Sequence, residues 1–168
     1  TAWVQRGQWA TLAAPLPRMP MFTKILVALD GGPQHAQVLA LAGSLAGPAS
    51  RLHLLCVLDP AFALADDAPR ADHAEYPAAD DQVHQAERLL ATALGSLRER
   101  GIDGLGHHPA GEPAEVICDY ARQHGCDLIV IGHRHLSRME RLLDRSVGQW
   151  TVDHAPCPVL VEVRGGDA

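Results

Sequence analysis

Short apolar runs alternate along this chain with longer stretches in which apolar residues recur at helical spacing. The runs are rich in Val, Ile and Leu and are bounded by Gly, Pro or Asp, a pattern that predicts β-strands. Strands are expected at residues 24–29, 52–58, 105–109, 127–131 and 158–163. The run at 127–131 is uniformly apolar after Asp127, which is typical of a central parallel strand covered on both faces.

The stretches between these runs predict four helices. In the first, Val38, Leu41, Ala42 and Leu45 share one face, and Gly47-Pro48 follows as a stop. The second is expected over about residues 80–100, the third begins at Pro113, and the fourth carries Val147, Trp150 and Thr151. Strands that alternate with helices need right-handed crossovers, so the sequence predicts one α/β domain with a doubly wound, five-stranded parallel sheet.

Length and composition limit the class of protein. A chain of 168 residues fits one domain with a substantial core. Acidic residues outnumber basic ones by 20 to 14, which argues against nucleic-acid binding, and no apolar run approaches the roughly 20 residues that span a bilayer. The four cysteines form no C-x-x-C pair, so reduced thiols in a cytoplasmic protein are favoured over a disulfide or a zinc site.

The ends of the chain differ from its body. Residues 1–20 lack either periodicity, and Pro15 and Pro17 interrupt their apolar stretch, so a poorly ordered leader is favoured over a signal peptide. The domain is therefore expected over residues 21–164, with a short tail at 165–168. Residues 60–79 form a long acidic connection, which is expected to be a solvated loop.

A ligand site is expected at one edge of the sheet. In an open α/β sheet, ligands bind beyond the carboxyl ends of the strands, where the chain switches direction. The strands at 24–29 and 127–131 are expected to flank that switch point. Their carboxyl ends are Asp30-Gly31-Gly32 and Gly132-His133-Arg134-His135, and these two loops form the candidate site.

Several segments, in order, resemble the universal stress protein family. Residues 24–31 (KILVALDG) resemble its first strand, and residues 111–117 (GEPAEVI) resemble the start of its third helix. Residues 126–132 (CDLIVIG) resemble its fourth strand and phosphate loop. Ser146-Val147 and residues 155–161 (APCPVLV) resemble its last helix and strand. The resemblance extends over residues 22–163 and implies a homodimeric, cytoplasmic protein with a role in surviving stress.

The resemblance also bears on whether the chain binds ATP, which is the one cofactor that the resemblance allows. One branch of the family binds ATP through Gly-x-x-Gly, nine residues and then Gly-Ser or Gly-Thr, because glycines let backbone N–H groups approach phosphates. Here Gly132 and Ser146 match, but His135 and Arg145 stand at two glycine positions. Binding is therefore expected to be weak or absent, as in the branch named for universal stress protein A.

Other positions of the ATP-binding branch are matched by resemblance alone. Asp30, followed by Gly31, matches the acid that meets ribose or metal, and Leu52 falls where an apolar residue meets adenine. The altered loop is basic, so an anion site built from guanidinium groups and a solvated surface are both open. Its basic residues are His133, Arg134, His135, Arg138, Arg141 and Arg145. No metal is expected, because His133 and His135 lack a third ligand.

Three functions are considered: a non-enzymatic stress module that acts through an unidentified protein partner, a nucleotide- or anion-binding switch with slow hydrolysis, and an enzyme of a related fold. The first is preferred. PP-loop enzymes carry Ser-Gly-Gly-x-Asp-Ser after the first strand and nucleotidyl transferases carry a His-x-Gly-His pair. Residues 30–35 (DGGPQH) fit neither motif.

The last strand is expected at an edge of the sheet. It would present an apolar row of unpaired residues there, which favours association with another strand. The row comprises Val159, Leu160, Val161 and Val163. The resemblance implies that two such edges meet about a two-fold axis, which makes these residues the candidate dimer interface.

Overall fold

The computed structural model describes residues 21–60, 77–132 and 147–163. The strands are β1 (Phe22–Ala28), β2 (Ala46–Leu55), β3 (Asp103–His107), β4 (Leu128–Gly132) and β5 (Val159–Glu162). The helices are α1 (His35–Leu45), α3 (Pro77–Glu99), α4 (Pro113–His124) and α6 (Val147–His154). The strands form one parallel sheet in the order β3-β2-β1-β4-β5. The predicted fold class is therefore confirmed.

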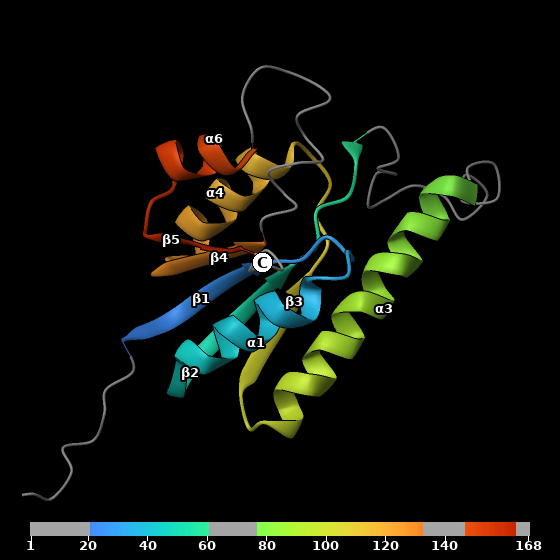
Figure 1. Ribbon diagram of the computed structural model, residues 1–168. Coiled ribbons are helices and arrows are strands. Elements are labelled where there is room, and N and C mark those ends of the chain that lie inside the picture. Colours follow the sequence, from blue (N-terminus) through green and yellow to red (C-terminus); the bar gives the residue numbers. More distant parts are fainter. Residues whose placement is uncertain (1–20, 61–76, 133–146, 164–168) are drawn as a thin grey trace, which may run out of the picture.

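Helices cover the sheet on both faces (Figure 1). On one face, α1 and α3 pack against side chains that include Ile25 and Val27 of β1. On the other, α4 packs against side chains that include Leu26 of β1 and Ile129 of β4. These strand residues are 0 % exposed, because successive side chains of a strand point to opposite faces and both faces are covered.

The two strands on the β3 side of the sheet differ from their predicted bounds. β2 begins directly after α1, where Ser50 Oγ donates to the Phe22 carbonyl and accepts the Gly47 N–H. Beyond Leu55, pairing continues through single hydrogen bonds, from Cys56 N to the His107 carbonyl and then from Leu58 N to the Pro109 carbonyl. β3 starts two residues before the predicted run, because its Asp103 pairs with Arg51 of β2.

Asp127 fastens the start of β4 to the start of β1. Its Oδ2 accepts hydrogen bonds from Thr23 N and Thr23 Oγ1, both at 2.7 Å, and its Oδ1 accepts the Lys24 N–H at 3.0 Å. Burial alone would raise the pKa of Asp127, but these hydrogen bonds hold its pKa below the usual value. β4 accordingly begins one residue later than predicted, after this carboxylate.

Helix α4 begins and ends as its sequence requires. Pro113 occupies its first turn, where a missing N–H costs nothing, which confirms the predicted start. Gly125 ends it with φ 61°, and the Gly125 N–H donates to the Ala121 carbonyl. Lys24 Nζ donates to the His124 carbonyl at 2.9 Å, so β1 also holds this end of α4. In the described parts of the chain, no helix combines the length and apolarity needed to cross a membrane.

The contact between α3 and β3 depends on a strand glycine. A Cβ added at Gly104 would come within 3.0 Å of the side chains of Leu94 and Leu97 on α3. Gly104→Ala should therefore lower the free energy of unfolding by about 1–2 kcal/mol, because the Leu94 and Leu97 side chains must move to make room. Gly95→Ala on α3 is the control, since no atom lies within 4 Å of the added Cβ and alanine favours a helix. Urea unfolding of both variants measures the difference, and an equal change in both would contradict the packing argument.

Candidate functional site

The carboxyl edge of the sheet brings together loops from several strands. β1 leads into the turn Asp30-Gly31-Gly32, in which Asp30 Oδ1 accepts the Gly32 N–H at 2.8 Å. Gly31 has φ 69°, a conformation that side chains disfavour, so a glycine is needed there by the backbone. The turn holds the half-buried Asp30 carboxylate at the switch point, where the sequence predicted it.

Helix α1 starts at this turn. The Gly32 carbonyl accepts the His35 N–H at 3.1 Å and lies 2.8 Å from His35 Nδ1. A carbonyl only accepts, so the ring nitrogen that faces it must carry the proton. The imidazole of His35 therefore stabilises the turn between β1 and α1, and its Nδ1 cannot act as a base there.

Gly132 at the end of β4 has a structural role that needs no ligand. A Cβ added to it would lie 3.0 Å from Cγ2 of Val38, which is buried in α1. A side chain at this position would push α1 away from the sheet. The match of Gly132 to a phosphate-binding glycine is therefore explained equally well by the close approach of a helix to a strand.

The thiol of Cys56 lies beside Asp30 at the same edge. Burial raises the pKa of Cys56 to about 11, and the negative charge of Asp30 contributes in the same direction. Such a thiol stays protonated at neutral pH and is a poor nucleophile. The other cysteines, Cys118, Cys126 and Cys157, are also free thiols, and burial raises the pKa of each.

The side chain of Leu52, which was expected to meet adenine, lies in the core, and its role in binding stays a prediction. Leu52 is 0 % exposed within the core on the α1 side, and it pairs with Ile25 in the middle of the sheet. The part of the chain after β2 that reaches the edge is Cys56 and Val57, both half-buried. Neither was predicted from the sequence, because the apolar run from 52 to 58 does not show where the strand leaves the core.

At this edge, two further side chains carry buried oxygens without a hydrogen-bond partner in the described part of the chain. They are Oε1 of Gln34, at the start of α1, and Oε2 of Glu162, which pairs with Gly132 across β4 and β5. An unpaired buried oxygen costs free energy that a donor would recover. Together with Asp30, these groups make the described part of the carboxyl edge, which excludes residues 133–146, rich in hydrogen-bond acceptors. Such a surface suits ligands with hydroxyl groups or positive charge and disfavours phosphate.

The other predicted site residues lie outside the described residues. They are His133, Arg134, His135, Arg145 and Ser146. Val147 is the first residue of α6. The structure therefore brings Asp30, Gly31 and Gly132 to one edge, and the roles predicted for the basic loop stay predictions. Among the residues described, no group of three or more His, Cys, Asp or Glu side chains is placed to hold a metal.

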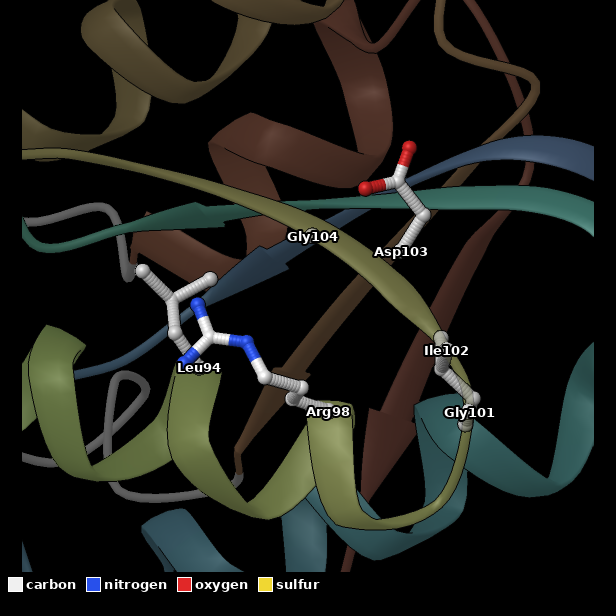
Figure 2. Close-up of a pocket in the computed structure, with 6 residues that line it drawn as sticks. All are labelled: Leu94, Arg98, Gly101, Ile102, Asp103 and Gly104. Carbon is white, nitrogen blue, oxygen red and sulfur yellow. The ribbon is translucent and has the colours of Figure 1, made fainter.

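An open pocket of about 340 Å³ lies at the opposite edge of the sheet (Figure 2). It is lined by Leu94, Arg98, Gly101, Ile102, Asp103 and Gly104. In Figure 2 the Arg98 side chain extends along α3 toward Leu94, whereas Asp103 points away from it. Asp103 instead accepts a hydrogen bond from Arg51 Nε at 2.6 Å. The pocket therefore gathers no reactive groups, and the carboxyl edge is the better candidate site.

The sheet order and the polar loops at its switch point define a small α/β protein of the nucleotide-binding type. The chain belongs to the universal stress protein family, whose model matches residues 21–164. It is 28 % identical over 146 residues to universal stress protein YxiE of Bacillus subtilis, a match that covers 84 % of this chain and 99 % of the relative.

Solved structures of the family share the fold. Universal stress protein UspA from Lactobacillus plantarum superposes with a TM-score of 0.67 at 27 % identity, over 83 % of this chain and 97 % of the other. The universal stress protein from Archaeoglobus fulgidus, in complex with dAMP, gives a TM-score of 0.60 at 20 % identity, over 85 % and 98 %.

The packing role of Gly132 predicts a coupling with Val38. Gly132→Ala should lower the free energy of unfolding by about 1–2 kcal/mol, because the new methyl group overlaps Val38. In Val38→Ala that overlap is relieved, so the two changes together should cost less than the sum of the single changes, by at least about 0.5 kcal/mol. Urea unfolding of the wild type and the three variants gives this double-mutant cycle. Additive effects would contradict the role assigned to Gly132.

Proposed function

We propose that this chain is a non-enzymatic, cytoplasmic member of the family that forms homodimers, acts through a protein partner and binds ATP weakly or not at all. The observation that carries the proposal is the replacement of two phosphate-binding glycines by His135 and Arg145, with the spacing of the motif intact. A Cβ at such a position keeps backbone N–H groups from coming within about 2.7–3.2 Å of phosphate oxygens.

The described part of the carboxyl edge supports the same conclusion. Its polar side chains are Asp30, Gln34 and Glu162, and the unpartnered oxygens of the last two accept rather than donate. A triphosphate would bring several negative charges toward two carboxylates. The arginines of residues 133–146 could offset that repulsion by charge-assisted hydrogen bonds.

The same groups offer no evident catalytic pair within the described regions. The Cys56 thiol, with a pKa of about 11, is not activated, and His35 Nδ1 is engaged with the Gly32 carbonyl. A nucleophile and its base need to lie within hydrogen-bonding reach of each other. These contacts support a module that acts by binding rather than by catalysis.

A second candidate function is a switch that binds an adenine nucleotide with a single phosphate. It is favoured by the Archaeoglobus fulgidus relative, which is described in complex with dAMP. Asp30 could accept hydrogen bonds from ribose hydroxyl groups, and one phosphate makes less demand on the altered loop than three do. On this alternative AMP binds more tightly than ATP.

Calorimetric titration with magnesium ATP and with AMP tests both candidates. The wild type should bind ATP weakly or not at all, and His135→Gly with Arg145→Gly should raise its ATP affinity at least tenfold, which corresponds to about 1.4 kcal/mol. The control, His135→Ala with Arg145→Ala, removes the same charge but keeps both Cβ atoms and should not gain affinity. Tight ATP binding by the wild type that both variants weaken would overturn the proposal and show a working arginine site.

The proposed dimer is tested at β5. In the single chain, Val159 and Val161 pack on the α4 side of the sheet and Leu160 on the other, whereas Val163 is 60 % exposed. Val163→Lys should therefore leave the fold intact and weaken the dimer by burying an unpaired charge.

Sedimentation at micromolar concentration compares Val163→Lys with the control Val152→Lys. The control changes a valine of similar exposure, 55 %, that lies on α6 and not beside β5. A wild type that sediments as a monomer would contradict the proposed assembly.

A further inference from the structure

Away from the carboxyl edge, a cluster of rings joins α4 to β2 and β3. It comprises His53 of β2, His107 of β3, and Tyr120 and His124 of α4, and we call it the His53 cluster. The rings of Tyr120 and His124 stack with centroids 4.0 Å apart, and His107 lies 5.3 Å from Tyr120. The ring of His53 lies 5.6 Å from that of His124. Three imidazoles therefore surround one phenol at the end of a helix.

His53 is the buried member of the cluster, with only one of its ring nitrogens paired. The residue is 5 % exposed, its Nδ1 lies 3.0 Å from the Tyr120 hydroxyl, and its Nε2 is buried without a partner. Burial raises the pKa of Tyr120 to about 12, so the hydroxyl keeps its proton and can donate to Nδ1. The neutral ring then carries its own proton on Nε2. Protonation of Nδ1 would break the hydrogen bond in that direction and place a charge in the core.

The charged and titratable groups around His53 would oppose that charge. Lys24 of β1, Arg51 of β2, His107 of β3 with His108 after it, and His124 of α4 are cationic or become cationic in acid. Cys126 lies near Tyr120 and its thiol is neutral, because burial raises its pKa to about 11. The nearby carboxylates are already paired, Asp103 with Arg51 and Asp119 with Arg122. No described element thus supplies His53 with an unpaired counter-charge.

The direction of the resulting pH dependence follows from these contacts. Burial, and then the charges of His124, His107, Lys24 and Arg51, lower the pKa of His53 below 6.5. The pKa of His107 is lowered by burial and by His124 and His108. When a histidine has a lower pKa in the folded state, the folded state binds fewer protons than the open one. The contribution of such a histidine to the free energy of unfolding is therefore unchanged above about pH 6.5. As the pH falls below that value, the histidine disfavours the folded state progressively.

We propose that the His53 cluster is a pH-responsive contact, which holds the last turn of α4 against β2 and β3 at neutral pH and releases it in acid. Elsewhere the turn is held by a hydrogen bond from Lys24 Nζ to the His124 carbonyl at 2.9 Å, by one from Arg122 Nη2 to the His154 carbonyl at 3.1 Å, and by the burial of Ala121 and Cys126 in the core. Leu105, on the same face of β3, is already 41 % exposed. Release of α4 would enlarge this apolar surface, so acid would change the surface that the protein presents to a partner.

Amide hydrogen exchange of the full chain tests this proposal. Protection factors, which correct for the intrinsic effect of pH, are compared at pH 7.5 and pH 5.5 for residues 121–126 and, as an internal reference, for residues 90–97 of α3. A single histidine with the usual pKa near 6.5 when open and a lowered pKa when closed favours the open state by at most about tenfold at pH 5.5. The wild type should lose up to about tenfold in protection at 121–126, and much less at 90–97.

Variants separate the cluster from a general effect of acid. His53→Gln removes the buried titration, and His124→Gln removes one neighbouring charge at an exposed position, so it keeps the test valid if the first variant does not fold. Both should reduce the acid-induced loss of protection at 121–126, whereas the control His84→Gln on the exposed face of α3 should behave like the wild type. Equal losses in wild type and His124→Gln, or equal losses at 121–126 and 90–97, would overturn the proposal.

Discussion

Burial of the central strands on both faces is the constraint from which the rest of the structure follows. The side chains of β1 and β4 alternate between the two faces, and those in the middle of the sheet are at most 3 % exposed on either one. Helices must therefore cover each face, and the chain must cross from α1 on one side to α4 on the other. β1 and β4 are neighbours in the sheet, but the chain after β1 leads to β2 on one side and the chain after β4 leads to β5 on the other. That divergence places Asp30 and Gly132 at the same edge.

The packing of α1 against β4 limits what the family's phosphate-binding motif says about function. Gly132 matches a phosphate-binding position in sequence, yet its lack of a side chain also lets Val38 approach β4 closely. A residue needed for packing is retained whether or not a ligand binds. Two other glycine positions of the family motif bear on the ligand, and there this chain has His135 and Arg145. Weak ATP binding is therefore inferred from those two positions rather than from Gly132.

Much of the fold could be predicted from periodicity, because strands and helices bury their apolar residues at different spacings. The limits of β2 and β3 could not, since they depend on pairs such as Arg51 with Asp103 and on Gly104 beneath α3. The His53 cluster gave no pattern in the sequence, because its four residues come from three elements and meet only through the sheet register and the placement of α4. Asp30 and Gly31 were found because strand ends are marked by turn residues.

We propose that this chain keeps a nucleotide-binding fold but has lost the backbone site for a triphosphate. The nucleotide content of the freshly purified protein tests that claim most directly. Acid extraction followed by chromatography and mass spectrometry measures the ATP that accompanies the folded chain. We expect only trace ATP, far below one molecule per chain. ATP recovered in a stoichiometric amount would contradict the claim and show that the arginines replace the missing glycines.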